Sequence, residues 1–241
     1  MIAIDGPAGT GKSTATRRLA DALGYVHVDT GALYRAIAWL SLQQLGVGTE
    51  GELPDSAAEA ATATEVARSV NLEFRRLPKL NPANRLLANG KDLTGFIRTP
   101  EVSMASSRIS AVPGVRAALL GLQRRLGCVG RAILEGRDIG TVIFPDAEVK
   151  FFLTASVEER AKRRLIELEA AGADAPPFDE VKRQIEERDR GDSTRAVAPL
   201  RRADDAIEID TSRLTLDEVV RLMEAKAKEK LKSAWPAPKP S

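Results

Sequence analysis

The residues best placed to do chemistry stand near the start of the chain, in the run GPAGTGKST. This run fits the pattern G-x-x-x-x-G-K-[ST], which binds the phosphates of a nucleoside triphosphate when it follows a strand and opens a helix. Lys12 is expected to reach the β- and γ-phosphates, and the hydroxyl of Ser13 to bind Mg²⁺. Glycines let backbone N–H groups turn toward phosphate oxygens, with the positive end of a helix behind them. The residues predicted to bind the nucleoside triphosphate are Gly6, Pro7, Ala8, Gly9, Thr10, Gly11, Lys12, Ser13 and Thr14.

Two other polar segments follow apolar runs that predict buried strands. They are DTGALYR, Asp29–Arg35, and EGRD, Glu135–Asp138. Ligands of doubly wound sheets bind at the carboxyl ends of strands, so we expect both segments beside the phosphate loop. An alternative for the second segment is a buried structural ion pair between Arg137 and Asp138. Asp29 and Glu135 are the two candidates for orienting the water ligands of Mg²⁺.

Arginines gather in two further segments, ERAKRR and RDRGDSTR, on either side of AGADAPPFDE. Arg160, Arg163 and Arg164 are spaced to share one helical face. Solvated helix faces are one interpretation. We favour a lid that closes over the triphosphate, with AGADAPPFDE as its turn. The predicted catalytic residues are Lys12, Arg160, Arg164 and Arg195, whereas Arg163 and Arg190 are expected to face water.

These groups need a scaffold, and the apolar patterns predict one. Five runs predict parallel strands, at 2–5, 25–28, 132–135, 149–154 and 206–210. Helices are expected at 12–23, 32–45 and 56–69, after Thr99-Pro100, and after capping boxes at Ser156/Glu159 and Thr215/Glu218. Strands alternating with helices indicate an α/β fold with a doubly wound, five-stranded parallel sheet.

The segment 46–98 interrupts the alternation and predicts an inserted α+β lobe, with a β-hairpin turn at Asn89-Gly90. The expected organisation is a core at 1–45 and 99–230, a helical lid at about 160–195, and a disordered Pro-rich tail at 233–241.

Composition narrows the class of protein. The 241 residues carry a net charge of +2 and only 4% aromatic residues, which argues against a nucleic-acid-binding ATPase. One cysteine precludes an intrachain disulfide, and no apolar run is long enough to span a bilayer, so we expect a cytoplasmic protein without membrane contacts. No N-K-x-D motif for guanine is present, which argues against a GTPase and leaves the small kinases.

Together these motifs resemble the bacterial cytidylate (CMP) kinases, a P-loop nucleoside-monophosphate kinase family. The resemblance rests on IDGPAGTGKST, DTGALYRA, IRTPEVSMASS, EGRDIGTVIFPDAEVKFFLTAS, ERAKRR and ERDRGDSTRAVAPL, in family order from residue 2 to about 210. It implies a three-layer P-loop fold and transfer of a phosphoryl group from ATP, with Mg²⁺, to CMP or dCMP. It also implies a monomer that binds no nucleic acid.

The resemblance further implies the residues that bind the acceptor. Arg35 and Arg137 would grip the CMP phosphate, since two planar guanidinium groups suit a dianion. Asp138 would accept from the cytosine amino group, while Ser107 and Arg116 donate to the ring. Tyr34, Arg188 and Asp192 would contact the ribose, and Thr30 stands where the family often has serine. Two alternatives stay open: a kinase for another acceptor, such as UMP, AMP or a small acid, and a nucleotide-binding module without catalysis.

Overall fold

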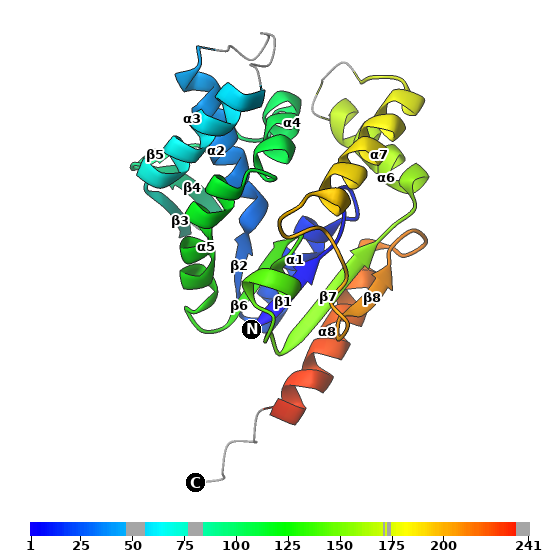
Figure 1. Ribbon diagram of the computed structural model, residues 1–241. Helices are drawn as coiled ribbons and strands as arrows, with labels where there is room; N and C mark the ends of the chain where they lie inside the picture. Colours follow the sequence, from blue (N-terminus) through cyan, green and yellow to red (C-terminus); the bar gives the residue numbers. More distant parts are fainter. Residues whose placement is uncertain (47–55, 77–83, 171, 173–174, 235–241) are drawn as a thin grey trace. The chain divides into compact units, whose positions relative to one another are not determined.

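The computed structural model describes residues 1–46, 56–76, 84–170, 172 and 175–234 (Figure 1). The chain forms two compact units, one of Met1–Val28 with Leu126–Ser241 and one of Asp29–Arg125. The lobe predicted at 46–98 falls inside the second unit, and the division into core, lobe and lid stays a prediction. The tail predicted at 233–241 begins too early, because residues 233 and 234 still belong to the last helix, Leu216–Ala234; residues 235–241 lie outside the described residues.

The first unit is built on a five-stranded sheet with the order β2-β6-β1-β7-β8. The pairs β1–β6, β1–β7 and β7–β8 are parallel. This sheet confirms the predicted α/β class. The strands are β1 (Ile2–Asp5), β2 (Val26–Asp29), β6 (Ala132–Gly136), β7 (Val149–Thr154) and β8 (Ile207–Asp210).

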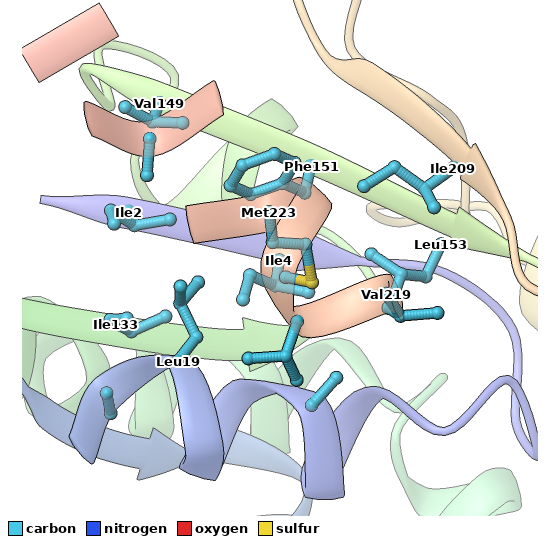
Figure 2. Close-up of a cluster of buried hydrophobic side chains, with 14 residues drawn as sticks. Ile2, Ile4, Leu19, Ile133, Val149, Phe151, Leu153, Ile209, Val219 and Met223 are labelled. Atoms are coloured by element: carbon cyan, nitrogen blue, oxygen red, sulfur yellow. The ribbon is translucent and has the colours of Figure 1, made fainter. Parts of the chain in front are cut away.

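Apolar side chains explain why this sheet forms. The central strands β1 and β6 are buried along their whole length, as expected of parallel strands covered on both faces. Figure 2 shows Ile4 and Phe151 of the sheet packed with Leu19 of helix α1 (Lys12–Leu23) and Met223 of helix α8 (Leu216–Ala234). Each such side chain contributes roughly 1.5–3 kcal/mol when it leaves water. This core gives the loops at the strand ends a rigid base.

Three more elements complete the first unit. They are helix α6 (Val157–Ala170), helix α7 (Phe178–Thr194) and a π-helical turn, η1 (Ile139–Ile143). Thr215 and Glu218 cap one another reciprocally, which confirms the predicted capping box there. At the other predicted box Ser156 Oγ accepts the Glu159 N–H at 3.2 Å, but the Ser156 N–H donates to Ser212 Oγ at 2.9 Å, so only half of that box forms. The π-helical turn was not predicted. Its widened hydrogen bonds run from the N–H groups of Ile143 and Phe144 to carbonyls five residues earlier.

The second unit combines four helices with a small antiparallel sheet. The helices are α2 (Thr30–Gln44), α3 (Ser56–Ser69), α4 (Pro100–Ile109) and α5 (Pro113–Gly127). The strands are β3 (Leu72–Arg76), β4 (Asn84–Ala88) and β5 (Lys91–Asp92), in that order. Asn89 and Gly90 both have positive φ, at 49° and 82°, as the predicted tight hairpin turn requires.

One predicted boundary is wrong by two residues. Helix α2 begins at Thr30 rather than Ala32, because Asp29 Oδ1 accepts the Ala32 N–H at 3.0 Å and acts as the N-cap. Strand β2 accordingly continues to Asp29. Across the described residues, the structure contains no helix long and apolar enough to cross a membrane.

Candidate functional site

Strand register aligns the two glycine-containing segments of the first unit. Ile4 of β1 pairs with Glu135 of β6, and Asp5 pairs with Gly136. The two parallel strands therefore end at the same level, and the chain that leaves each one begins at the same sheet edge. The phosphate loop and the EGRD segment share the edge at which ligands of such sheets bind.

The phosphate loop has the backbone that an anion site needs. Gly9 and Gly11 have φ of 77° and 82°, values that side chains disfavour. A Cβ on Gly6 would lie 2.1 Å from the Leu153 carbonyl oxygen, so that position admits only glycine. Gly11 caps α1 without any side-chain hydrogen bond, and the first turn has no acidic residue. The backbone N–H groups at the start of α1 are thus available to bind an anion.

Lys12 is buried inside this loop, with 6% of its surface exposed. Its ammonium group donates to the Pro7 carbonyl and lies 3.4 Å from Thr10 Oγ1. Burial, reinforced by the charge of Arg137, lowers the pKa of Lys12 well below its ordinary value, against the opposing charges of Glu135 and Asp5. A phosphate beside Lys12 would supply the negative charge that stabilises the ammonium form.

Ser13 connects the loop to the end of β6. Its exposed hydroxyl donates to Glu135 Oε2 at 2.8 Å, and His27 Nε2 lies 2.9 Å from Glu135 Oε1. Within the described ranges no three His, Cys, Asp or Glu side chains form a metal cluster. Mg²⁺ commonly binds through one or two protein oxygens, substrate phosphates and water. Of the two acids predicted to orient its water ligands, Glu135 is the one bonded to Ser13.

Arg137 and Asp192 form an ion pair between the EGRD segment and α7. Arg137 Nε lies 2.9 Å from Asp192 Oδ2, and Asp192 is almost fully buried. Burial alone would raise the pKa of Asp192, but Arg137, Arg188 and Arg195 outweigh it and hold the pKa below its ordinary value. The carboxylate therefore stays ionised among three guanidinium groups, and it offsets one of their three positive charges.

The neighbouring Asp138 has a different partner. Arg195 NH2 lies 3.4 Å from Asp138 Oδ1, and Arg195 Nε donates to the Ala198 carbonyl at 2.7 Å. Ala198 has φ of 51°, a strained value for alanine. The alternative of an ion pair between Arg137 and Asp138 is wrong, because each side chain pairs with a residue of the 188–195 segment instead.

Asp5 fixes the turn that carries these two side chains. Its carboxylate accepts the N–H groups of Ile139 and Gly140 at 2.9 and 2.7 Å. Burial, opposed by these two hydrogen bonds and reinforced by the charge of Asp138, raises the pKa of Asp5 to about 6. The end of β1 thus holds the first turn of η1, directly after Asp138.

Arg160 lies under the phosphate loop and is 3% exposed. Its guanidinium donates to both carboxylate oxygens of Asp189, at 3.0 and 2.5 Å, and to the Ala8 carbonyl at 3.2 Å. Its Nε donates to the Ala155 carbonyl at 3.1 Å. Arg160 therefore links the loop, the start of α6 and helix α7.

The other arginines of α6 and α7 differ in environment. Arg164 lies about one third exposed beside Glu167 of its own helix, and Arg190 is exposed. The expectation that Arg163 faces water is wrong. Arg163 donates to the Thr211 side chain and carbonyl, at 3.0 and 2.7 Å, because the end of β8 lies within its reach. Thr211 Oγ1 also lies 3.1 Å from the Thr10 carbonyl, so this contact supports the phosphate loop.

The second unit contains its own group of predicted site residues. Asp29 Oδ2 lies 2.7 Å from Arg35 NH2 and 3.9 Å from Arg98 NH2. A Cβ on Gly31 would lie 3.2 Å from both Arg35 and Asp29, so glycine there leaves room for this pair. The carboxylate of Asp29 is engaged with the cap of α2 and with arginine, which weakens its case as a magnesium residue.

Tyr34 and Arg116 pack together in the same unit. The Arg116 guanidinium carbon lies 5.7 Å from the Tyr34 ring centroid, and Arg116 donates to the Ser110 carbonyl at 3.2 Å. Both residues are buried, as is Thr30, whereas Ser107 is half-buried on α4.

The family described as cytidylate kinase matches residues 2–229 of the chain. The chain belongs to the cytidylate kinase family. A cytidylate kinase of Geobacter sulfurreducens is 48% identical over 95% of this chain and 93% of its own length, and one of Citrifermentans bemidjiense is 48% identical over 96% and 94%. A bifunctional pantoate ligase/cytidylate kinase of Synechocystis is 50% identical over 91% of this chain and 41% of its own length.

For this member of the cytidylate kinase family, the first unit gathers most of the predicted ATP-site and lid residues around the phosphate loop. Arg164 is the exception, because it pairs with Glu167 of its own helix. The roles assigned to the residues of both units remain predictions. The sequence did not single out His27, Asp189, Arg98 or Thr211. Two of them carried a signal, since Arg98 lies in the quoted motif IRTPEVSMASS and Asp189 in ERDRGDSTRAVAPL.

Proposed function

We propose that the protein transfers the γ-phosphoryl group of ATP to CMP, and to dCMP, giving ADP and CDP or dCDP. The observation that carries this proposal is the pairing around EGRD. There the cation Arg137 and the acceptor Asp138 stand in adjacent positions, and each is neutralised by a residue of the 188–195 segment. A cation beside a buried hydrogen-bond acceptor suits a ligand with a phosphate and an amino-bearing base.

The donor nucleotide would occupy the phosphate loop. The N–H groups at the start of α1 and the ammonium of Lys12 would bind its phosphates. Ser13 would bind Mg²⁺, and Glu135 would orient the water ligands of the ion. When bound, Mg²⁺ neutralises charge on the β- and γ-phosphates. This chain's own contribution is position and positive charge.

The acceptor would be held by the side chains that the family resemblance implies. Arg35 and Arg137 would bind its phosphate, and Tyr34, Arg188 and Asp192 its ribose, with Thr30 nearby. Asp138 would accept from the cytosine amino group, while Ser107 and Arg116 donate to the ring. Uracil presents a carbonyl oxygen where cytosine presents the amino group, so Asp138 would face an acceptor. An unpaired buried polar group costs roughly 1–3 kcal/mol.

Transfer itself needs no covalent intermediate, because the acceptor is already a phosphate oxygen anion. The transferred group would be stabilised by Lys12, Arg160, Arg164 and Arg195 in an in-line displacement. In the structure Arg160 is engaged with Asp189, and Arg195 with Ala198 and Asp138. Binding of the triphosphate would exchange these internal acceptors for phosphate oxygens. We further propose that the enzyme acts as a monomer.

The experiment is coupled ADP release from Mg·ATP with CMP, dCMP, UMP, AMP or no acceptor. The expected result is fast turnover with CMP and dCMP and little with the others. Turnover with UMP or AMP instead would still show a nucleoside-monophosphate kinase, but it would refute the contacts proposed to the cytosine base. ATP binding without acceptor-dependent turnover would refute the kinase and leave a nucleotide-binding module. Asp146→Ala, which removes an exposed carboxylate eight residues after Asp138, serves as the matched control for variants of Asp138.

A further inference from the structure

The single histidine of the chain, His27, lies on β2 next to Glu135, the acid that is bonded to Ser13 of the phosphate loop. Strand β2 is the hydrogen-bonded neighbour of β6, whose last buried side chain is Glu135. His27 Nε2 lies 2.9 Å from Glu135 Oε1, with 13% of the histidine side chain and 4% of the glutamate side chain exposed. Nothing in the phosphate-loop pattern calls for a histidine at this position.

The two oxygens of Glu135 have different partners. Oε2 accepts the hydroxyl proton of Ser13 at 2.8 Å, while Oε1 faces His27. An ionised carboxylate can only accept hydrogen bonds, so His27 Nε2 must carry the proton in this contact. A carboxylate held from both sides has one rotamer and one orientation.

That orientation determines what Ser13 can offer a cation. A hydroxyl group has one proton and two lone pairs. When the proton points to Glu135, both lone pairs are turned away from the carboxylate, and the side chain of Ser13 is exposed. The Ser13 oxygen is then available to bind a metal ion.

Lys12 is a competing partner for the Glu135 carboxylate. Glu135 lies close enough to Lys12 for its charge to oppose the fall in the lysine pKa. Without a second anchor, the attraction between the ammonium and the carboxylate would favour rotation of Glu135 toward Lys12. Such a rotation would withdraw the acceptor from Ser13 and neutralise the lysine that ATP requires.

We propose that His27 is a positioning residue for the magnesium–nucleotide site, which holds Glu135 so that Ser13 presents its lone pairs to the metal ion. This inference rests on the proposed function only for the location of the magnesium and nucleotide. It assigns to β2 a role in metal binding that no phosphate-loop residue supplies. Partners that orient a metal ligand commonly change metal affinity about 10- to 100-fold when they are removed.

The test measures metal binding directly. Mn²⁺ replaces Mg²⁺ as the probe, because both prefer carboxylate, carbonyl and water oxygens, and its binding to the protein with ADP is followed by electron paramagnetic resonance. His27→Leu should weaken Mn²⁺ binding about 10-fold. His27→Gln keeps an N–H donor and should restore affinity to within about threefold of the wild type. Val26→Ala, on the same strand and exposed, is the matched control and should bind as the wild type does.

A second comparison separates positioning from simple space filling. In a Glu135→Gln background, His27→Leu should weaken Mn²⁺ binding by less than twofold, because the residue it acts through is already altered. Equal binding by wild type and His27→Leu would refute the proposal, and so would equal losses for the leucine and glutamine variants. Should the leucine variant not fold, His27→Phe keeps a ring without the donor and carries the same expectation.

Failure of this inference is distinguishable from failure of the proposed function. Mn²⁺·ADP binding requires no phosphoryl transfer, so the His27 comparison stands even if CMP is not the acceptor. Conversely, CMP-dependent ADP release at saturating Mg²⁺ would support the proposed function even if all His27 variants bound Mn²⁺ equally.

Discussion

Asp5 offers a sharp test of how burial and hydrogen bonding balance beside the phosphate loop. The carboxyl group is 5% exposed and accepts the N–H groups of Ile139 and Gly140, yet burial raises its pKa to about 6. The perturbation is Asp5→Asn, which keeps one acceptor oxygen and removes the titration. Comparing the wild-type protein with this variant isolates the effect of proton binding at Asp5 on stability.

The sign follows from proton binding. Between pH 3.8, the ordinary pKa, and about 6, the folded protein holds a proton that the unfolded chain releases. The contribution of Asp5 to the free energy of unfolding is thus full below pH 3.8 and lost as the pH rises through 6. Since one pKa unit corresponds to about 1.4 kcal/mol, the loss is about 3 kcal/mol.

The assay is urea unfolding, followed by far-ultraviolet circular dichroism, between pH 4 and pH 7.5. The difference in free energy of unfolding, wild type minus Asp5→Asn, should fall by about 2.4 kcal/mol over this range, because part of the contribution is already lost at pH 4. Asp21→Asn, which alters an exposed carboxylate on α1, controls for general charge effects and should show no such fall. A difference that is constant or rises with pH would refute the argument that burial dominates at Asp5.

The remaining predictions concern Lys12, Asp138, Arg195 and Ala198. Lys12→Met should raise the melting temperature of the nucleotide-free protein, because it removes a buried charge, and should lower turnover at least ~1000-fold; a lower melting temperature would contradict this. Asp138→Ala should shrink the CMP-over-UMP ratio of kcat/KM about 10-fold or more, and an unchanged ratio would exclude Asp138 from base recognition. Arg195→Ala should lower kcat more than it raises the KM for CMP, whereas a pure KM effect would move Arg195 to the acceptor site. Ala198→Gly should raise the free energy of unfolding by about 0.5 kcal/mol in urea titrations, since glycine accepts the positive φ of 51° at less cost; a loss would contradict strain at this carbonyl.

Helices, strands and turns were predicted from short local sequence patterns. The phosphate loop ends on Gly11 and α1 ends before Gly24, both in left-handed conformation, so the predicted helix 12–23 has its observed bounds. The cap at Thr99 and the turn at Asn89-Gly90 are equally local. Such signals depend on a few adjacent residues, and the sequence displays them directly.

Partner choice among charges was not predictable in the same way. Arg137 pairs with Asp192, 55 positions away, rather than with its neighbour Asp138. Arg160 is bonded to Asp189 of α7, although the sequence pattern had marked the arginines of this region as ligands of the triphosphate. Both outcomes depend on how α7 packs, and a run of charges contains no such information. The π-helical turn at η1 is likewise held from outside, by the carboxylate of Asp5.

The strand order has a consequence for how the chain reaches its native state. Strand β1 is made first, but both of its neighbours, β6 and β7, lie more than 100 residues later. The central sheet therefore has to close a long loop, which is slow. The second unit, Asp29–Arg125, is continuous in sequence. It can begin to fold on the ribosome before β6 and β7, the partners of β1, have been synthesised. A nascent chain halted shortly after Arg125 has emerged would hold β1 without either of its sheet partners, which leaves an unpaired strand open to aggregation.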